Sequence, residues 1–173
     1  MPKPLKVKGV HHAALPCRDG EETRRFYEDL LGLPLAHVVR GDDLPGGGQG
    51  TGPYCHLFFR MGDGSYLAFF DLGTGRGAEP SPNAPFWVNH LALEMASLDE
   101  LQAAKQRLIE AGIAVRGAID HEFVQSIYFL DPSGHLVELT AKTAPPGYLE
   151  RCAAEARAKL DAWTRERRGQ SSS

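Results

Sequence analysis

The side chains best suited to chemistry in this chain are two histidines and a glutamate that lie far apart in the sequence. His12 begins the segment HAAL, His90 begins the similar segment HLAL, and Glu138 lies in a third segment, HLVEL. Two imidazoles and one carboxylate on one concave face form a ligand set suited to Fe(II), with Mn(II) or another divalent ion as candidates, and leave positions open for water or substrate. We therefore expect a divalent metal at His12, His90 and Glu138, provided that the fold brings them together.

Residues 117–138, with the sequence GAIDHEFVQSIYFLDPSGHLVE, surround this glutamate with further polar groups. The DPSG segment has proline where a type I turn favours it and glycine where φ must be positive, which is typical of a three-residue hairpin loop with a bulge. In that register Tyr128 lies directly opposite Glu138. A two-residue loop would turn Glu138 to the other face, but Gly134 suits the left-handed conformation better than Ser133 does, so we prefer the first register.

The elements that would position these residues occur in the same order twice, as a strand, a helix and three strands. The similarity extends from HAAL and HLAL to MGDGSYLAFF and LDPSGHLVEL, and Gly32 ends the first helix as Gly112 ends the second. The expected strands cover 8–15, 35–39, 54–61 and 65–71 around a helix over 19–32, then 86–95, 113–117, 124–131 and 135–141 around a helix over 97–112.

This repeat predicts the organisation of the chain. We expect one domain over residues 1–146, with a first module at about 8–71, a linker over 72–85 and a second module at about 86–142. We also expect a C-terminal helix over 147–168 and a disordered tail over 169–173. Apolar residues recur on one face of that helix, and the alternatives are that it packs on the barrel or on a second subunit.

Composition favours a globular protein and excludes several other classes. The chain has 173 residues, of which 42% are hydrophobic and 24% charged. No apolar run approaches the roughly 20 residues of a membrane helix, and residues 1–9 lack the apolar core of a signal peptide, so we expect a cytoplasmic protein without membrane contact. Three cysteines without a CxxC spacing suggest neither disulfides nor a thiolate zinc site, and a net charge of −3 gives no reason to expect nucleic acid. A small-molecule ligand fits best.

The motifs resemble those of the vicinal oxygen chelate superfamily, which includes glyoxalase I, methylmalonyl-CoA epimerase, fosfomycin resistance enzymes, bleomycin resistance proteins and extradiol ring-cleaving dioxygenases. The resemblance covers roughly residues 8–142 and is carried by HHAAL, FYEDLLGL, NHLALEM and DPSGHLVEL. It implies an α+β fold in which two paired βαβββ modules form a cup-shaped half-barrel around a metal held by His12, His90 and Glu138. It also implies a homodimer, which is common in the superfamily.

A narrower resemblance links residues 117–138 to the signature of the extradiol dioxygenases. It implies an Fe(II) or Mn(II) enzyme whose partners are dioxygen and a catecholic or small aromatic substrate, with His121 and Tyr128 as catalytic residues that donate hydrogen bonds to substrate oxygens. The alternatives are that His121 is a surface residue at a loop edge and that Tyr128 only fills the barrel. The matching residues are Gly117, Ile119, His121, Ile127, Tyr128, Asp131, Pro132, Gly134 and Glu138.

The first module departs from the extradiol pattern at one position. Those enzymes carry an acid/base histidine where this chain has Ser65, and they contain two pairs of modules, whereas we expect one pair in these 173 residues. His56 is the nearby residue that could act as a proton relay in its place. The alternative is that His56 is an imidazole packed in the interior.

Two other kinds of protein in the superfamily remain as alternatives. The first is a metalloenzyme of the glyoxalase, isomerase or epimerase type, or of the fosfomycin resistance type. Isomerase-type members usually have a fourth ligand where this chain has Ala68, and a phosphonate substrate would need several inward cations, of which only Arg60 is an obvious candidate. The second is a metal-free binding protein for an antibiotic or another small molecule. We expect an extradiol-type dioxygenase in preference to both.

Overall fold

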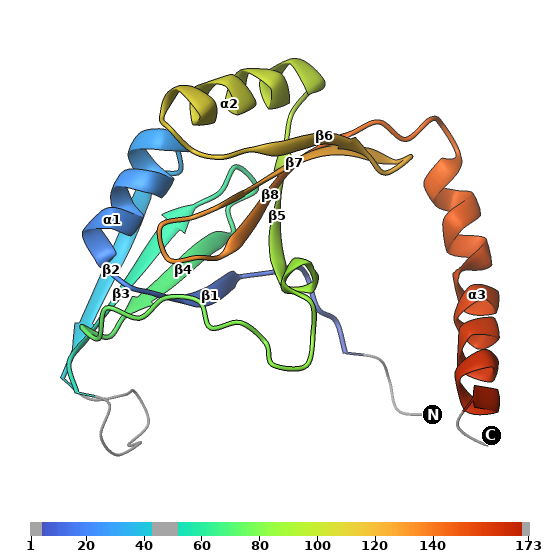
Figure 1. Ribbon diagram of the computed structural model, residues 1–173, viewed down its shortest axis with the longest axis horizontal. Helices are drawn as coiled ribbons and strands as arrows, with labels where there is room; N and C mark the ends of the chain where they lie inside the picture. The colour runs from blue at the N-terminus through green and yellow to red at the C-terminus, as the bar shows by residue number, and fades with distance from the viewer. Residues whose placement is uncertain (1–4, 43–51, 171–173) are drawn as a thin grey trace.

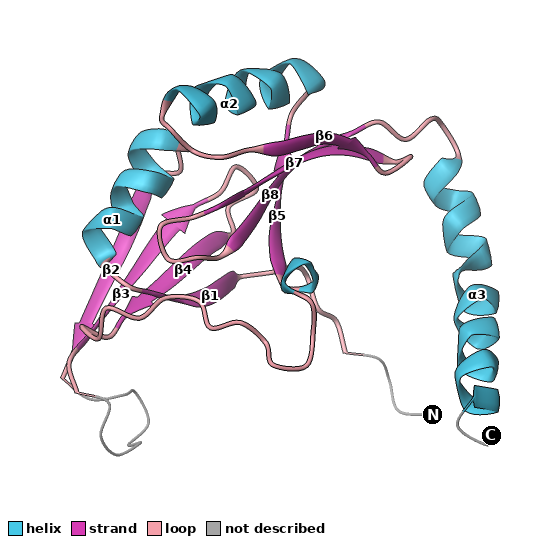
Figure 2. Cartoon of the chain, in the orientation of Figure 1, coloured by secondary structure: helices cyan, strands magenta, loops and turns pink. Residues whose placement is uncertain are grey.

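The computed structural model of the protein describes residues 5–42 and 52–170 and shows two similar modules followed by a long helix (Figures 1 and 2). The first module contains β1 (His12–Cys17), α1 (Gly20–Arg24), the π-helix η1 (Arg25–Leu30), β2 (Leu35–Gly41), β3 (Tyr54–Arg60) and β4 (Tyr66–Asp71). The second contains the 3₁₀ turn η2 (Phe86–Val88), β5 (His90–Met95), α2 (Leu98–Glu110), β6 (Arg116–Asp120), β7 (Val124–Leu130) and β8 (Leu136–Lys142). Helix α3 (Tyr148–Gln170) follows and includes residues 169 and 170, which we had expected in a disordered tail, whereas residues 171–173 lie outside the described residues.

Each module forms one four-stranded mixed sheet, so the predicted α+β class and the repeat are confirmed. The strand orders are β1-β4-β3-β2 and β5-β8-β7-β6, with β1 parallel to β4 and β5 parallel to β8. Among the described strands, β1 and β5 are both edge strands, and the two sheets stay open and separate.

The hairpin registers agree with those predicted from the turn residues. Tyr128 is paired with Glu138, and in the first module Phe58 is paired with Ala68. The backbone of Gly134 has a φ of 88°, the left-handed conformation that the three-residue loop requires. The side chains of Tyr128 and Glu138 therefore share one face of the second sheet.

Three strands begin later than predicted. Strand β1 begins at His12 rather than at residue 8, and the later starts of β5 and β6 have local causes. Residues 86–88 form a turn in which the amide of Val88 donates to the carbonyl of Pro85, so the strand begins only at His90. After α2, the amide of Ile113 donates to the carbonyl of Leu108 and closes the helix end. Because the chain at residues 113–115 is still leaving the helix end, β6 starts at Arg116 and extends to Asp120.

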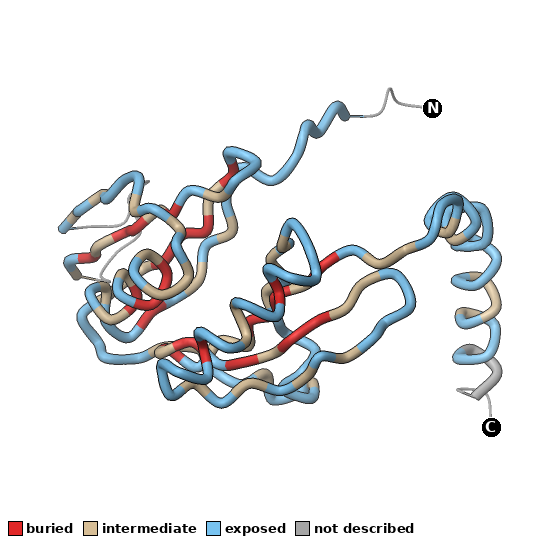
Figure 3. The backbone as a smooth tube through the Cα atoms, turned by 90° about the horizontal axis from the view of Figure 1, so that it is seen from above, coloured by how far each residue is buried: buried red, intermediate tan, exposed pale blue. Residues whose placement is uncertain are grey.

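The core lies on the helix-covered faces of the two sheets and joins the modules (Figure 3). The rings of Phe26 and Phe129 lie 6.1 Å apart across the junction, and the buried hydroxyl of Tyr27 donates to Asp131 Oδ2 at 3.0 Å. Because side chains alternate along a strand, the opposite faces carry the other half of each strand's residues. These are the faces on which the candidate site residues lie.

Helix α3 extends away from the two modules (Figure 1). Its first turn is anchored by Tyr148, whose hydroxyl donates to Glu122 and whose ring stacks on Phe123. Further along, Leu160 and Trp163 are more than half exposed, so within the described residues this part of the helix does not pack on the barrel. None of the helices in the described part of the chain combines the length and the apolar character needed to cross a membrane.

Candidate metal and substrate site

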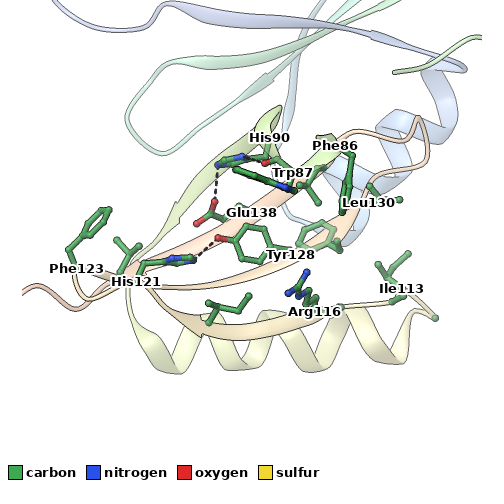
Figure 4. Close-up of a pocket in the computed structure, with 17 residues that line it drawn as sticks. Phe86, Trp87, His90, Ile113, Arg116, His121, Phe123, Tyr128, Leu130 and Glu138 are labelled. Atoms are coloured by element: carbon green, nitrogen blue, oxygen red, sulfur yellow. Dashed lines mark hydrogen bonds and ion pairs between the residues drawn. The ribbon is translucent and has the colours of Figure 1, made fainter. Parts of the chain in front are cut away.

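An open cavity of about 900 Å³ lies on the exposed face of the second sheet (Figure 4). Its walls are mainly apolar, and η2 contributes the large rings of Phe86 and Trp87. Five polar side chains face the cavity, from β5, β6, β7, β8 and the β6–β7 loop. They are His90, Arg116, His121, Tyr128 and Glu138.

Two of the three predicted metal ligands are adjacent in this cavity. The Nε2 atom of His90 lies 3.2 Å from Oε2 of Glu138, whose residue is only 6% exposed. The register explains the contact, because Glu138 is paired with Ala92, two residues beyond His90 on the neighbouring strand. Both side chains therefore point from the same face of the β5–β8 pair.

The hydrogen bonding of His90 fits a bound cation. Its Nδ1 lies 3.0 Å from the carbonyl oxygen of Trp87, which can only accept, so Nδ1 carries a proton. In the neutral imidazole, Nε2 then directs its lone pair at the Glu138 carboxylate. A cation between the two groups, either a proton or a metal ion, turns this repulsive contact into an attractive one. The pair thus has the donor set and the outer support of two ligands of a divalent metal.

The two residues predicted to be catalytic also meet in the cavity. His121 Nε2 and the hydroxyl of Tyr128 lie 2.8 Å apart (Figure 4). Burial and the neighbouring negative charge of Glu138 raise the pKa of Tyr128, so its hydroxyl stays protonated and available as a donor. His121 comes from the short loop between β6 and β7, and its backbone amide is fixed by the carbonyl of Val124.

The third predicted ligand, His12, lies on the first sheet with His56. The rings of His12 and His56 have centroids 6.2 Å apart, and His56 is stacked on Phe70 at 3.6 Å. The Nε2 atom of His56 is buried and has no hydrogen-bond partner among the residues that the structure describes. Burial, followed by the neighbouring rings of His12 and His37, lowers the pKa of His56, so its neutral form is favoured.

The first-sheet histidines do not contact the cavity of the second sheet. Within residues 5–42 and 52–170, no group of three or more His, Cys, Asp or Glu side chains is arranged to hold a metal ion. The structure thus brings together two predicted ligands, His90 and Glu138, with His121 and Tyr128, and places His12 with His56 on a separate face.

Comparison with known proteins identifies the family. The model of the Glyoxalase/Bleomycin resistance protein/Dioxygenase superfamily matches residues 9–139, which include both modules. The chain belongs to this superfamily. The match confirms the expected vicinal oxygen chelate fold, and it includes His12, His56, His90, His121, Tyr128 and Glu138.

Two proteins of Bacillus subtilis (strain 168) are similar to this superfamily member. "Putative ring-cleaving dioxygenase MhqE" is 31% identical over 112 residues, which make up 56% of this chain and 35% of that protein. "Putative ring-cleaving dioxygenase MhqA" is 26% identical over 149 residues, or 83% of this chain and 43% of that protein. The chain thus spans less than half the length of either relative.

Solved structures show the same fold. A glyoxalase/dioxygenase from Nostoc punctiforme is 26% identical and superimposes with a TM-score of 0.60, over 83% of this chain and 97% of that one. The fosfomycin resistance protein FosX from Listeria monocytogenes, complexed with Mn(II) and sulfate, is 20% identical with a TM-score of 0.55. Its alignment covers 80% of this chain and 95% of the FosX chain, and at this identity it supports the fold alone.

One polar residue of the cavity was not predicted from the sequence. Arg116 is paired with Tyr128 at the start of β6 and thus faces the cavity. The turn residues that fixed the β7–β8 register have no counterpart for β6, whose irregular pairing skips a residue between Gly117 and Ile119. The sequence therefore gave no means of assigning Arg116 to a face.

Proposed function

We propose that the chain is an extradiol-type dioxygenase that cleaves the ring of a catecholic or small aromatic substrate and depends on a divalent metal. Fe(II) is the metal we propose, with Mn(II) or another divalent ion as the alternative. The observation that carries the proposal is that the His90–Glu138 and His121–Tyr128 pairs face the same largely apolar cavity. The signature in residues 117–138 and the names of the two relatives support it.

The polar residues have separate roles in this proposal. His90 and Glu138 would hold the metal, which as a Lewis acid would lower the pKa of a substrate hydroxyl and orient the reactants. Tyr128 donates a hydrogen bond to a substrate oxygen as negative charge develops there, and His121 holds the phenol in place and accepts or returns its proton. Trp87 and Phe86 cover a flat ring and keep water from it.

The proposed reaction balances with these two partners alone. The carbon–carbon bond between one hydroxylated ring carbon and its unhydroxylated neighbour breaks, and both atoms of dioxygen enter the product. Dioxygen is reduced and the ring is oxidised, so catechol gives an open-chain aldehyde-acid without another reductant. One proton leaves a substrate hydroxyl and one returns to the product, which is the work of His121 and Tyr128.

We propose that the site is completed in a homodimer, in which His12 of one copy joins His90 and Glu138 of the other. Edge strands β1 and β5 each begin with a predicted ligand. Exposed apolar residues lie just before both, with Val7 and Val10 ahead of β1 and Trp87 ahead of β5. A twofold contact of β1 with β5 would cover both apolar segments and bring the imidazoles together twice.

The same contact would bring His56 to the cavity. His56 lies beside His12 on the first sheet, so its ring would lie next to the ligands that His12 shares with the other copy. We propose His56 as the proton relay in place of Ser65, which instead donates to Asp63 within its own turn.

A reducing compartment suits this chemistry, and we propose that the protein acts in the cytoplasm. Its cysteines are free thiols, with Cys17 buried and Cys55 and Cys152 half-buried. Thiols and Fe(II) are both maintained under reducing conditions.

The proposed function is tested by metal reconstitution followed by oxygen uptake. The purified protein is loaded anaerobically with Fe(II) or Mn(II), its metal content is measured, and oxygen consumption is followed with a panel of catechols. We expect bound metal, oxygen uptake with at least one catechol, and a ring-opened product that contains both atoms of labelled dioxygen. Tight metal binding with no oxygen uptake would contradict the dioxygenase proposal.

Matched variants test the site itself. Glu138→Gln and His90→Ala should lose the metal, because each removes one of the two adjacent ligands. Glu94→Gln is the control, since Glu94 lies on β5 but is exposed and forms an ion pair with Lys142. If Glu138→Gln kept the metal content of Glu94→Gln, the assignment of Glu138 as a ligand would be wrong.

A further inference from the structure

We infer that the substrate carries an anionic substituent, a carboxylate or a group of similar shape and charge, which Arg116 binds. The inference rests on the proposed function, because it takes the His90–Glu138 end of the cavity as the place of the reacting oxygens. It assigns a chemical group to the other end of the substrate, away from the reacting oxygens. Arg116 is thereby a residue that determines substrate specificity.

The register places Arg116 in line with the reactive residues. Arg116 is paired with Tyr128 across β6 and β7, and Tyr128 is paired with Glu138 across β7 and β8. Paired residues project from the same face, so these three side chains form a row across the sheet. Two strand spacings separate the ends of this row by about 10 Å between backbones. A single ring with oxygens at one end and an acidic group at the other fits between them.

Arg116 is exposed, and its positive charge has no partner side chain among the described residues. Arg24 of helix α1, by contrast, pairs with Glu21, Glu28 and Asp29. In the described part of the chain, Arg116 makes neither an ion pair nor a side-chain hydrogen bond, and its guanidinium points from β6 toward the ring of Tyr128 (Figure 4).

Few side chains near Arg116 could replace the water around its guanidinium if a ligand displaced that water. The neighbouring cavity residues Ile113, Val115 and Leu130 are aliphatic and offer no acceptor side chain. A ring lying over Tyr128 would displace water from the guanidinium and leave its donors unpaired unless the ring brought an acceptor. A carboxylate meets the two parallel N–H groups of arginine with matching geometry, which makes it the natural choice.

The first module has no such cation at the equivalent place. There the row runs from His37 through Phe58 to Ala68, in the positions of Arg116, Tyr128 and Glu138. The two modules thus share the row of positions, but only the second carries a carboxylate at one end and a permanent cation at the other. Arg116 is thus one of the residues that distinguish the second module, which carries the proposed site, from the first.

Binding measured without turnover tests this inference separately from the reaction. The chain has two tryptophans, and Trp87 lies in the cavity while Trp163 lies on α3. In a Trp163→Phe background, quenching of Trp87 fluorescence reports ligand binding. The ligands are 3,4-dihydroxybenzoate and 3,4-dihydroxybenzamide, which differ in charge but hardly in shape, and both are titrated anaerobically so that no ring is opened.

We expect the acid to bind about tenfold more tightly than the amide, the gain from one charge-assisted pair. Arg116→Met should remove this preference and leave the affinity for the amide unchanged, which also shows that the cavity is intact. Arg60→Met is the matched control, because Arg60 is an exposed arginine at the end of β3 with no ion pair among the described residues. It should keep the preference.

Equal affinity of the unsubstituted protein for acid and amide would overturn the inference, and so would a preference that survives in Arg116→Met. Failure of the two proposals can be told apart. Selective binding through Arg116 without oxygen uptake on any catechol supports the inference and contradicts ring cleavage. If oxygen uptake were the same with the acid and the amide, and the same in Arg116→Met as in the unsubstituted protein, ring cleavage would be supported and the inference contradicted.

Discussion

At the scale of single residues, Glu138 connects the two halves of the proposed site. Its buried carboxylate lies 3.2 Å from His90, and across the hairpin it is paired with Tyr128. A buried carboxylate is stable only with a compensating charge or donors, and within the cavity His90 is its close partner. A bound cation is therefore expected to stabilise the carboxylate.

Substitution of Tyr128 by phenylalanine should lower turnover without removing the metal. The change deletes the hydroxyl that lies 2.8 Å from His121 and leaves the ring in place. Loss of a proton donor in the transition state costs about 100-fold or more in rate. The measurements are kcat for oxygen uptake and the metal content of the same sample.

The control for this variant is Tyr66→Phe in the first module. The hydroxyl of Tyr66 makes no hydrogen bond to any residue that the structure describes, so turnover should be unchanged. Equal turnover of Tyr128→Phe and the unsubstituted protein would mean that the phenol takes no part in the reaction. The ring would then serve only to fill the cavity.

The residue types of the site were predictable, but only part of their arrangement was. Turn chemistry at Gly134 fixed the register that pairs Tyr128 with Glu138, which is a local effect. His12 and His90 were recognisable as equivalents from the repeat, but the repeat says nothing about how one sheet lies against another. That relation depends on long-range packing, and the structure places His12 on a different face from Glu138.

At the scale of elements, the β7–β8 turn holds the modules together. Asp131 accepts hydrogen bonds from the amides of Ser133 and His135 through Oδ1 and from the hydroxyl of Tyr27 through Oδ2. Ser133 and His135 extend the same turn to the first module and the linker, through Arg18, Pro16 and Ala78. The turn was predictable from DPSG, whereas its long-range partners were not.

Substitution of Tyr27 by phenylalanine should destabilise the whole domain. Tyr27 is fully buried, and without its hydroxyl the Oδ2 atom of Asp131 loses its donor in a buried place. The expected loss is about 1–3 kcal/mol in the free energy of unfolding. Urea unfolding followed by circular dichroism measures it, and Tyr66→Phe again provides the control with a free hydroxyl. A loss below that of Tyr66→Phe would show that the bond does not help to join the modules.

At the scale of the whole molecule, one hydrophobic core joins the helix-covered faces of the two sheets. Cys17 lies in this shared core near the junction and is 2% exposed. Burial raises the pKa of its thiol to about 11, so the reactive thiolate is scarce at neutral pH in the folded state. The thiol therefore reports on opening of the core.

Cys17 should be the last of the three cysteines to react with a thiol reagent. At pH 8 we expect Cys55 and Cys152, which are both half-buried, to react first and Cys17 only when urea unfolds the core. Mass spectrometry of labelled peptides over time gives the three rates. A rate for Cys17 equal to that of Cys152 without urea would mean that the junction between modules opens freely.

The proposed dimer makes a prediction that no single chain can satisfy. Suppose that His12 comes from one copy and Glu138 from the other. A dimer of His12→Ala chains then has no complete site, and neither does a dimer of Glu138→Ala chains. In a mixed dimer, one site carries both substitutions and the other carries neither. Random exchange by unfolding and refolding of an equal mixture should therefore restore about a quarter of the metal sites, since half of the dimers are mixed and each has one intact site of two.

Metal content and oxygen uptake of the refolded mixture are compared with those of each variant refolded alone. If each site were built within one chain, every site in the mixture would still carry one substitution, and mixing would restore nothing. A chain carrying both substitutions, mixed with the unsubstituted chain, supplies the control. Its mixed dimers contain two sites with one substitution each, so they should add no metal beyond that of the unsubstituted dimers. If each site were built within one chain, half of all sites would still bind metal. The two arrangements of His12, within one chain or across two, thus predict opposite results in both mixtures.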